Sequence, residues 1–429
     1  MSQLFKGQRV IRGYDVIDPS GFDEVVDAGE ELLMPGVIDC HVHVNDPGRD
    51  SWEGFSTATK AAAAGGISTI VDMPLNSIPS TTSRDAFNVK LDAAKGQLHV
   101  DVGFWGGVVP GNEAELPGMI EMGICGFKCF MIHSGVDEFQ WTNEADIRAA
   151  LRVLKGTDSV LMFHAELDVP GLQTEPKGDR VEYKTFLDSR PDVMEVEAID
   201  LVCRLCQEYQ VPCHIVHLAT ADALPLIRKC KQQGAPLTVE TTHHYLTLAA
   251  EDVPNGATQY KCCPPIRSQQ NQDDLWGGVL SGDIDMVVSD HSPCTTDLKT
   301  QGSGDFIAAW GGISSVQFGL SLLWTNLKSR GMNIHDLHRL LTTNTAKLPG
   351  LSKLKGSIEA GKHADFVIWA PESTFKITED IIQHKNKLTP YMNRTLNGVI
   401  SRTVVRGKTV YHNGKFNETP QGKATFRKN

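Results

Sequence analysis

The sequence predicts an α/β protein: a (β/α)8 barrel joined to a small β-sandwich domain formed from both ends of the chain. Three observations predict this. Short apolar, β-rich runs alternate with helical patterns through the middle of the chain, which is typical of parallel sheet. There are eight such runs, the number that closes a barrel, whereas a doubly wound open sheet would need another strand count. The two ends lack the alternation and contain short strands interrupted by turns.

The strand and helix predictions follow from apolar period and turn signals. The eight predicted strands cover 36–44, 66–74, 100–109, 123–131, 159–166, 211–219, 236–246 and 283–293. Helical patterns between them cover 52–65, 84–96, 144–156, 193–209 and 220–234. Several of these helices end in glycine, as helices often do.

The ends predict a separate small domain. Segments 354–372 and 396–416 read as short strands broken by Gly-Lys and Asn-Gly turns, and the strand-rich front of the chain completes them. A helical segment at 333–351 leads from the barrel back to this domain. We therefore expect a barrel over 35–349 and a small β domain from 1–34 and 350–429.

Length and composition suit a soluble enzyme. A chain of 429 residues is too long for one ordinary core but fits a large barrel with an appendage. The formal net charge of −11 argues against a nucleic-acid or anionic-membrane partner, which would require a basic face. No apolar run reaches the ~18 residues of a membrane span, and no targeting signal is legible. A cytoplasmic location is the default expectation.

The ten cysteines show no disulfide framework. Cys203 and Cys206 form a C-x-x-C pair, but no second pair completes a zinc knuckle. The pair lies in a helical pattern, so we interpret both as core thiols. Scattered cysteines in a chain of this length indicate a reducing compartment.

Metal-type and ionisable side chains stand at the ends of the predicted strands. The carboxyl ends of barrel strands meet at one face, where barrel enzymes place their active sites. His41 and His43, two residues apart, point to the same side of their strand. Each histidine alone is more often an ordinary core residue, and an aspartate there could cap a helix, but the combination indicates a metal site. The residues concerned are His41, His43, Lys128, His164, His217, Asp290 and His291.

Histidine and carboxylate ligands suit zinc best, with manganese, cobalt, nickel or iron as alternatives. Four histidines and one aspartate exceed the needs of one tetrahedral zinc, yet are few for two. Lys128 lies within an apolar strand run, where an unpaired ammonium would be costly. A neutral lysine can add carbon dioxide, and the resulting carbamate could bridge two metals. The residues alone leave this alternative and a lysine–carboxylate pair equally open.

Several motifs together carry a family resemblance. PGVIDCHVH (35–43), GFK (126–128), the strand-end histidines, SDHSP (289–293) and GSIEAGKHADF (356–366) resemble the cyclic amidohydrolases. Within that superfamily, longer phrases are most similar to the allantoinases. These phrases cover 46–81, 263–276, 288–294 and 309–317, and the resemblance runs from about residue 30 to the end.

The resemblance implies a binuclear zinc hydrolase. His41, His43 and Asp290 would bind one zinc, His164 and His217 the second, and Lys128 would bridge both as N6-carboxylysine. Asp290 would also be catalytic, moving the proton in hydrolysis of a cyclic amide C–N bond. The substrate implied is the small molecule (S)-allantoin, opened to allantoate in purine breakdown. Family members are usually homotetramers.

Substrate contacts are predicted at two positions. Dihydroorotases carry an arginine two residues after the second histidine, which binds the substrate carboxylate, and Asn45 stands there instead. Allantoin has no carboxylate, so an allantoinase would not need an arginine at this position, and Asn45 agrees with that. Asn76 and Ser292 are the candidate substrate contacts, while Arg49 and Arg267 are interpreted as structural.

Two alternatives remain open. One is another cyclic-amide hydrolase of the hydantoinase or dihydropyrimidinase type. The other is a non-catalytic dihydropyrimidinase-like scaffold that has lost its metals. The presence of all the metal-type residues speaks against the scaffold.

Overall fold

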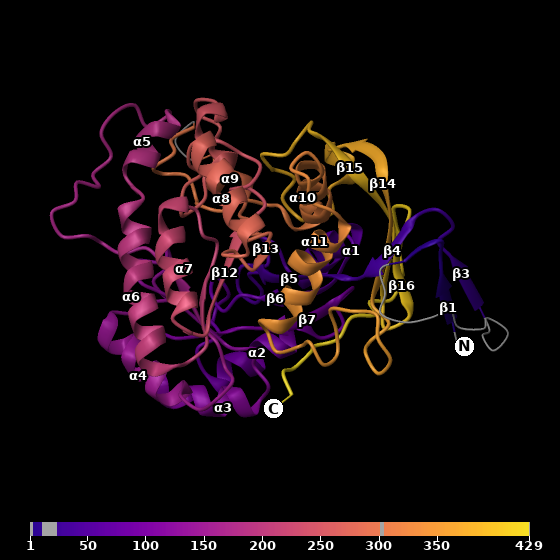
Figure 1. Cartoon of the computed structure of the whole chain (residues 1–429), viewed down its shortest axis with the longest axis horizontal. Coiled ribbons are helices and arrows are strands. Elements are labelled where there is room, and N and C mark those ends of the chain that lie inside the picture. The colour runs from indigo at the N-terminus through magenta and orange to yellow at the C-terminus, as the bar shows by residue number, and fades with distance from the viewer. Residues whose placement is uncertain (1–2, 11–23, 301–303, 429) are drawn as a thin grey trace.

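The computed structural model describes residues 3–10, 24–300 and 304–428. Its centre is a barrel of parallel strands, and each predicted run contains one (Figure 1). The third run is divided in two by Trp105. The strands are β5 (Val37–Val42), β6 (Ile67–Asp72), β7 (Asp101–Phe104), β8 (Gly106–Gly107), β9 (Phe127–Phe130), β10 (Leu161–His164), β11 (Cys213–Ile215), β12 (Leu237–Thr242) and β13 (Met286–Val288).

Backbone pairing closes these strands into a ring. One sheet has the order β5-β6-β7 and the other β13-β12-β11-β10-β9-β8, with parallel neighbours throughout. The two halves of the divided strand join the sheets on one side. On the other side His291, just after β13, pairs with Val42 of β5, and His43 N donates to His291 O at 2.8 Å. Closure brings the first and last strand ends together, which is required for His41 and Asp290 to meet.

Helices cover the outside of the barrel. The principal ones are α1 (Phe55–Ala64), α2 (Arg84–Ala94), α3 (Leu116–Glu121), α4 (Glu144–Leu154), α5 (Tyr183–Asp188), α6 (Val193–Tyr209), α7 (Leu224–Gln232), α8 (Gln269–Ser281) and α10 (Gly319–Lys328). Local sequence explains their starts: Ser83 accepts from Ala86 N, and Asn143 forms a capping box with Asp146. Gly282 ends α8 in the left-handed region, with φ of 82°. All five predicted helices are present.

The strands are buried on both faces, as in α/β barrels. On β9, Phe127 and Cys129 pack with the surrounding helices, whereas Phe130 packs inside the barrel with side chains such as Met162. Lys128 alternates with Phe127 and Cys129 and so points inward with Phe130. Strand period therefore places the lysine inside the barrel.

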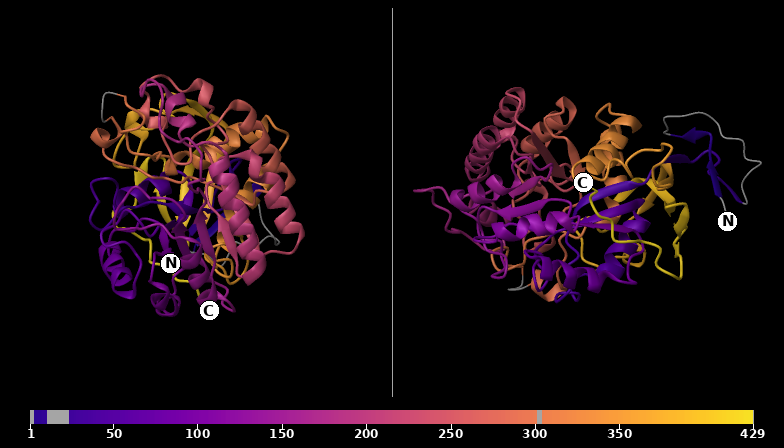
Figure 2. Two further views of the ribbon diagram at one scale, coloured as in Figure 1. Left: turned by 90° about the vertical axis from the view of Figure 1, so that its left-hand side faces the viewer. Right: turned by 90° about the horizontal axis from the view of Figure 1, so that it is seen from below.

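Strands from both ends of the chain form the small β domain, on the right of Figure 1. A six-stranded sheet has the order β17-β16-β15-β14-β4-β2, and a parallel pair, β1 and β3, packs against it. Phe5 and Phe366 meet between these layers with ring centroids 5.2 Å apart. The right view in Figure 2 shows this domain beside the barrel, and the left view, taken from the barrel side, shows it behind the barrel. Its strands are β1 (Gln3–Lys6), β2 (Arg9–Val10), β3 (Glu24–Asp27), β4 (Leu32–Pro35), β14 (Phe366–Lys376), β15 (Thr395–Val405), β16 (Lys408–His412) and β17 (Lys415–Phe416).

A buried ion network links the two parts. Lys355 Nζ donates to Asp101 at 2.8 Å and to Asp365 at 2.5 Å, and Arg406 also pairs with Asp101. Asp101 opens β7, whereas Asp365 immediately precedes β14. The tail then crosses the start of β7, since Thr425 N donates to Val102 O. This network lies at the amino ends of the barrel strands, away from the predicted site.

The predicted fold class is confirmed, both in the barrel and in the small β domain. The predicted boundaries at 34/35 and 349/350 stay a prediction. The segment at 333–351 is helical, as α11 (Ile334–His338), a π-helical turn (Arg339–Thr343) and α12 (Asn344–Lys347). Much of the front strand segment, 11–23, lies outside the described residues. Cys203 and Cys206 are buried free thiols of the core, and no described helix is long and apolar enough to span a membrane.

Candidate active site

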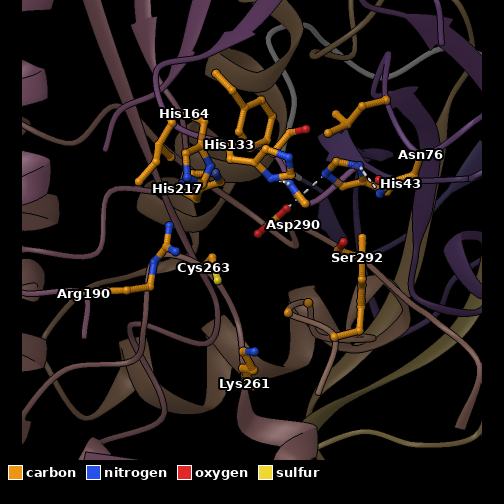
Figure 3. A pocket seen from close by; sticks show the side chains of 18 of the residues that line it. His43, Asn76, His133, His164, Arg190, His217, Lys261, Cys263, Asp290 and Ser292 are labelled. Carbon is orange, nitrogen blue, oxygen red and sulfur yellow. Dashed lines mark hydrogen bonds and ion pairs between the residues drawn. The ribbon is translucent and has the colours of Figure 1, made fainter. Parts of the chain in front are cut away.

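The carboxyl ends of the barrel strands open into one cavity of about 510 Å³. It is lined by side chains from strands far apart in sequence, and Figure 3 shows them converging. Those predicted from sequence are His43, Asn76, Lys128, His164, His217, Asp290 and Ser292. His41 lies directly behind this lining and is completely buried.

The first and eighth strands contribute a His–His–Asp group. Asp290 Oδ1 lies 3.0 Å from His41 Nε2 and 3.5 Å from His43 Nε2. The ligand atoms of His41, His217 and Asp290 all lie within 4.8 Å of one another. His41 and His217, which the prediction assigns to different metals, therefore lie close enough to share one metal centre. A binuclear centre would require this proximity.

The fifth and sixth strands contribute a second pair. His164 Nδ1 lies 3.0 Å from His217 Nε2, and the His164 ring stacks on Phe130 with centroids 4.3 Å apart. His217 Nδ1 is buried without a hydrogen-bond partner among the described residues. Such a nitrogen carries a desolvation cost unless some other group satisfies the ring.

The backbone at two of these positions is unusual. His217 has φ of 37° and Asp290 has φ of 41°, both in the left-handed region that non-glycine residues rarely adopt. Each stands just past the end of its strand. Strained backbone of this kind clusters at functional sites, where the surrounding structure enforces it. Here it turns both side chains into the cavity.

Burial sets the protonation of the cluster. It lowers the pKa of His43 to about 3, despite the raising effect of Asp290. Burial, together with His164, also holds the pKa of His217 well below its usual range. Burial works to raise the pKa of Asp290, but His41 and His43 outweigh it and the pKa lies well below normal. Neutral His43 and His217 beside an ionised Asp290 are in the protonation states that bind a divalent cation. Burial and Lys128 work to lower the pKa of His41, but Asp290 and Glu240 outweigh them and raise it.

Lys128 lies at the centre of the group. Its Nζ is 3.2 Å from His41 Nε2 and 5.2 Å from the Phe130 ring centroid, and the residue is 1% exposed. Burial lowers the pKa of Lys128 to about 8, although Asp290 and Glu240 oppose it. Within the described part of the chain, no carboxylate stands at ion-pair distance from this ammonium. The lysine–carboxylate alternative therefore finds no partner among the described residues, and the carbamate stays a prediction.

These residues fit the metal centre that the sequence predicts. The donor set consists of imidazole and carboxylate, the ligands zinc prefers, and it includes a buried nitrogen without a partner. A buried amine with a lowered pKa is also the form that adds carbon dioxide. The residues that would hold the metals are His41, His43, Lys128, His164, His217 and Asp290.

Comparison with known proteins agrees with this geometry. The model of the amidohydrolase family matches residues 32–410. An allantoinase of Streptomyces avermitilis is 46% identical over 414 residues, covering 96% of this chain and 92% of that protein. The mitochondrial allantoinase of Aquarana catesbeiana is 56% identical over 347 residues, 81% of this chain and 71% of that one. This chain belongs to the amidohydrolase family and, within it, to the allantoinases.

A solved structure supports the same fold. The L-hydantoinase (dihydropyrimidinase) of Arthrobacter aurescens superposes with a TM-score of 0.94 at 28% identity, covering 99% of this chain and all of that one. The amidohydrolase barrel and its small β domain are thus shared along the whole chain. The allantoinase relatives and the family match together support a hydrolase that acts on cyclic amides as the activity of this chain.

Sequence reasoning missed the carboxylates that hold the histidines. Glu240 on β12 pairs with His41 Nδ1 and lies 3.1 Å from His214 Nε2. Burial raises the pKa of Glu240, but His41 and His214 outweigh it and lower the pKa to about 2. This pairing leaves His41 Nε2 toward the cluster, as metal-ligating histidines require. A lone glutamate in the apolar run 236–246 was the available signal.

Glu166 orients His164, at the end of the fifth strand, as Glu240 orients His41. Its Oε2 accepts from His164 Nε2 at 2.7 Å, so Nδ1 of that ring faces His217. Arg190, which also lines the cavity, donates to both oxygens of Glu166 at 3.0 and 2.5 Å. Glu166 stands two residues after His164, and that spacing was a usable signal, whereas nothing local marked Arg190.

The predicted substrate contacts lie on the cavity wall. Asn76 has φ of 67°, and its Nδ2 is 3.5 Å from His43 Nδ1, while its buried Oδ1 has no partner among the described residues. Ser292 lines the same cavity, facing Gly312. Asn45, by contrast, is buried behind the lining and donates to Pro293 O at 3.2 Å. Asn76 thus presents an acceptor that a substrate N–H could satisfy.

The two arginines are held by protein groups. Arg49 donates to Asn76 O at 2.9 Å, pairs with Glu138 and lies over the Trp52 ring. Arg267 donates to Glu195 at 2.6 Å and is absent from the cavity lining. Both contacts fit the structural interpretation, with Arg49 supporting the backbone of Asn76.

Proposed function

We propose that this chain is an allantoinase that hydrolyses the hydantoin ring of (S)-allantoin to allantoate, a step of purine breakdown. The observation that carries the proposal is the 46% identity to an allantoinase over 96% of the chain, a span that includes all the residues of the candidate site. The geometry adds support, because the predicted ligand set gathers in one cavity large enough for a small heterocycle.

We assign two zinc ions to the cavity. His41, His43 and Asp290 would hold one, His164 and His217 the other, and Lys128 would bridge them as N6-carboxylysine. The cluster of His41, His217 and Asp290 and the inward position of Lys128 support this assignment. Bound there, the metals would supply Lewis-acid chemistry that polarises the ring carbonyl and lowers the pKa of a water molecule.

Asp290 would carry the proton. It lines the cavity, and its lowered pKa keeps it ionised at neutral pH, ready to accept a proton from the attacking water. As the C4–N3 amide bond breaks, Asp290 would return this proton to ring nitrogen N3, which leaves as the NH2 of a ureido group. The oxygen of the attacking water stays on C4, so the product is an open-chain acid.

Asn76 and Ser292 would orient the ring. The unpartnered Oδ1 of Asn76 suits a ring or ureido N–H of allantoin. Ser292, two residues after Asp290, would place a second polar contact near the proton-transfer group. Both contacts are made by neutral side chains. A substrate with a carboxylate would require a cationic side chain instead, and allantoin has no carboxylate.

The test is hydrolysis of racemic allantoin by zinc-loaded, bicarbonate-treated protein, with dihydrouracil and dihydroorotate in parallel. We expect allantoate from one enantiomer and little reaction with the other two compounds. Absence of allantoin turnover in protein with two bound metals would overturn the allantoinase assignment and leave the metal site standing.

A hydantoinase or dihydropyrimidinase is the second candidate, because the L-hydantoinase neighbour superposes over the whole chain. Preferential turnover of dihydrouracil or a 5-substituted hydantoin would select it. A non-catalytic scaffold is the third, and metal analysis with fewer than one bound metal per chain would favour it.

We also propose a homotetramer in the cytoplasm, with a small molecule as substrate and neither nucleic acid nor membrane as partner. Light scattering of the purified protein and fractionation of cells test the first two points. The mitochondrial name of one relative makes the fractionation informative.

A further inference from the structure

One wall of the cavity consists of a loop without regular structure. Residues 308–312 line the cavity together with Asp290 and Ser292. Gly312 has φ of 145°, and a Cβ there would overlap the carbonyl oxygen of Ser292. Because Gly311 and Gly312 lack side chains, the cavity meets the backbone itself on this wall, and whatever the cavity holds packs against that backbone. Its recognition properties therefore depend on how the backbone is held.

A buried lysine holds that backbone. Lys299, the last residue of α9 (Thr296–Lys299), is 5% exposed. Its Nζ donates to three carbonyl oxygens: Lys261 at 2.7 Å, Trp310 at 2.8 Å and Gly312 at 2.5 Å. An ammonium has three N–H groups, so all of them are used.

A second lysine extends the clamp. Lys261 Nζ donates to Ile307 O at 3.0 Å and to Ala309 O at 2.5 Å, and Gly312 N donates back to Lys261 O at 2.9 Å. Four carbonyls of the 307–312 loop are thus bound to two ammonium groups. Over the described ranges, no carboxylate stands at ion-pair distance from Lys299. Burying a cation that only carbonyl dipoles compensate costs free energy of folding. The same ammonium can, however, fix the directions of several carbonyl groups at once.

We propose that Lys299 is a positioning residue of the substrate site, whose ammonium fixes the carbonyls of Trp310 and Gly312 and so sets the backbone wall against which the substrate ring binds. The proposal rests on the proposed function for its kinetic readout. It differs from a purely structural role, which would change the stability of the fold and leave substrate affinity intact.

The protonation of Lys299 allows a second, independent test of this role. Burial lowers the pKa of Lys299 to about 8, against the raising effect of Cys294, Cys262 and Cys263; Lys261 acts with burial to lower it. His244 also lies near this ammonium. A neutral amine retains two N–H groups, so one of the three carbonyls loses its donor as pH rises through this range. We expect the wall to loosen accordingly.

The experiment compares Lys299→Met with Lys355→Met in zinc-loaded, bicarbonate-treated full-length protein. Lys355 is also buried, but it pairs with Asp101 and Asp365 at the other end of the barrel. At pH 7 we expect Lys299→Met to retain both metals and to raise KM for allantoin about tenfold or more. Hydrogen exchange should rise in peptides covering 304–313 and not elsewhere. Lys355→Met should lower the unfolding temperature with KM unchanged.

The pH dependence of KM is the second measurement. Wild-type KM should rise toward that of Lys299→Met above pH 8, while Lys299→Arg, which stays charged, should show no such rise. This comparison decides the matter should Lys299→Met fail to fold. An unchanged KM together with unchanged exchange at 304–313, or exchange raised throughout the chain, would overturn the proposal. If wild-type protein does not hydrolyse allantoin, the exchange data still decide between a local and a global role.

Discussion

His164 Nδ1 and His217 Nε2 lie 3.0 Å apart at the ends of the neighbouring strands β10 and β11. Glu166 occupies the other nitrogen of His164, while the other nitrogen of His217 has no partner among the described residues. Imidazole is the commonest metal ligand in proteins, and these two facing nitrogens are close enough together to bind one cation. This relationship supports the second of the two proposed metal sites.

His217→Asn should therefore remove about one metal ion per chain. The substitution deletes one proposed ligand and leaves the His41–Asp290 side intact. Metal content after zinc loading and desalting, measured by mass spectrometry, checks this. His133→Asn is the matched control, because His133 lines the cavity but is exposed and belongs to neither proposed ligand set. Equal zinc in both variants would contradict the role of His217.

Lys128→Ala should lose both metals and nearly all activity, because it removes the proposed bridge at the centre of the cluster. Added acetate or propionate should restore part of the zinc content and turnover, since a small carboxylate can occupy the space of the carbamate. Methylamine, which replaces only the amine, serves as the control. Full zinc occupancy without any added acid would rule out a carbamate bridge.

Asp290→Asn should lower kcat about 10³-fold with a smaller change in KM, because an amide cannot accept the proton at neutral pH. The protein should still bind zinc through the histidines, so steady-state kinetics must be paired with metal analysis. Near-normal turnover in a zinc-loaded sample would remove Asp290 from proton transfer.

Glu166→Gln and Glu240→Gln should each weaken zinc binding about 10–100-fold. Each glutamate accepts a ring N–H and so orients the opposite nitrogen of His164 or His41 toward the cluster. Competition with a chelator of known affinity measures the change. Gln272→Glu offers an isosteric control at a buried site outside the cavity lining. Wild-type affinity in both glutamate variants would show that these contacts serve packing alone.

His243→Gln should reduce the acid sensitivity of the fold. Burial and the neighbouring His244 lower the pKa of His243 to about 3 in the folded chain. Between that value and the usual 6.5, the unfolded chain binds a proton that the folded chain does not, so stability falls as pH falls. In the variant this proton is not taken up, so the free energy of unfolding should fall less steeply with pH, by about 1.4 kcal/mol per pH unit. Urea midpoints in chelator from pH 4 to 7 measure it, and parallel curves for both proteins would contradict it.

Much of this protein is legible in the sequence. Eight apolar runs separated by helical patterns predict the barrel, because strand and helix patterns are local properties of the chain. The positions of His41, His43 and Lys128 in these runs are read from the sequence in the same way. Residue type then indicated a metal site, because histidine and aspartate occur together at the ends of several strands.

Tertiary structure alone decided how those groups are used. Which nitrogen of His41 faces the cluster depends on Glu240, 199 positions away in the chain, and reaches it only through strand register. The contact between His41 and Asp290 exists because the barrel closes between β5 and β13. The clamp of Lys299 on the 307–312 loop joins residues without any shared local pattern. Local sequence thus determined the elements and the inventory of chemical groups, whereas chain closure determined their pairings, because contacts between distant segments follow from packing rather than from period.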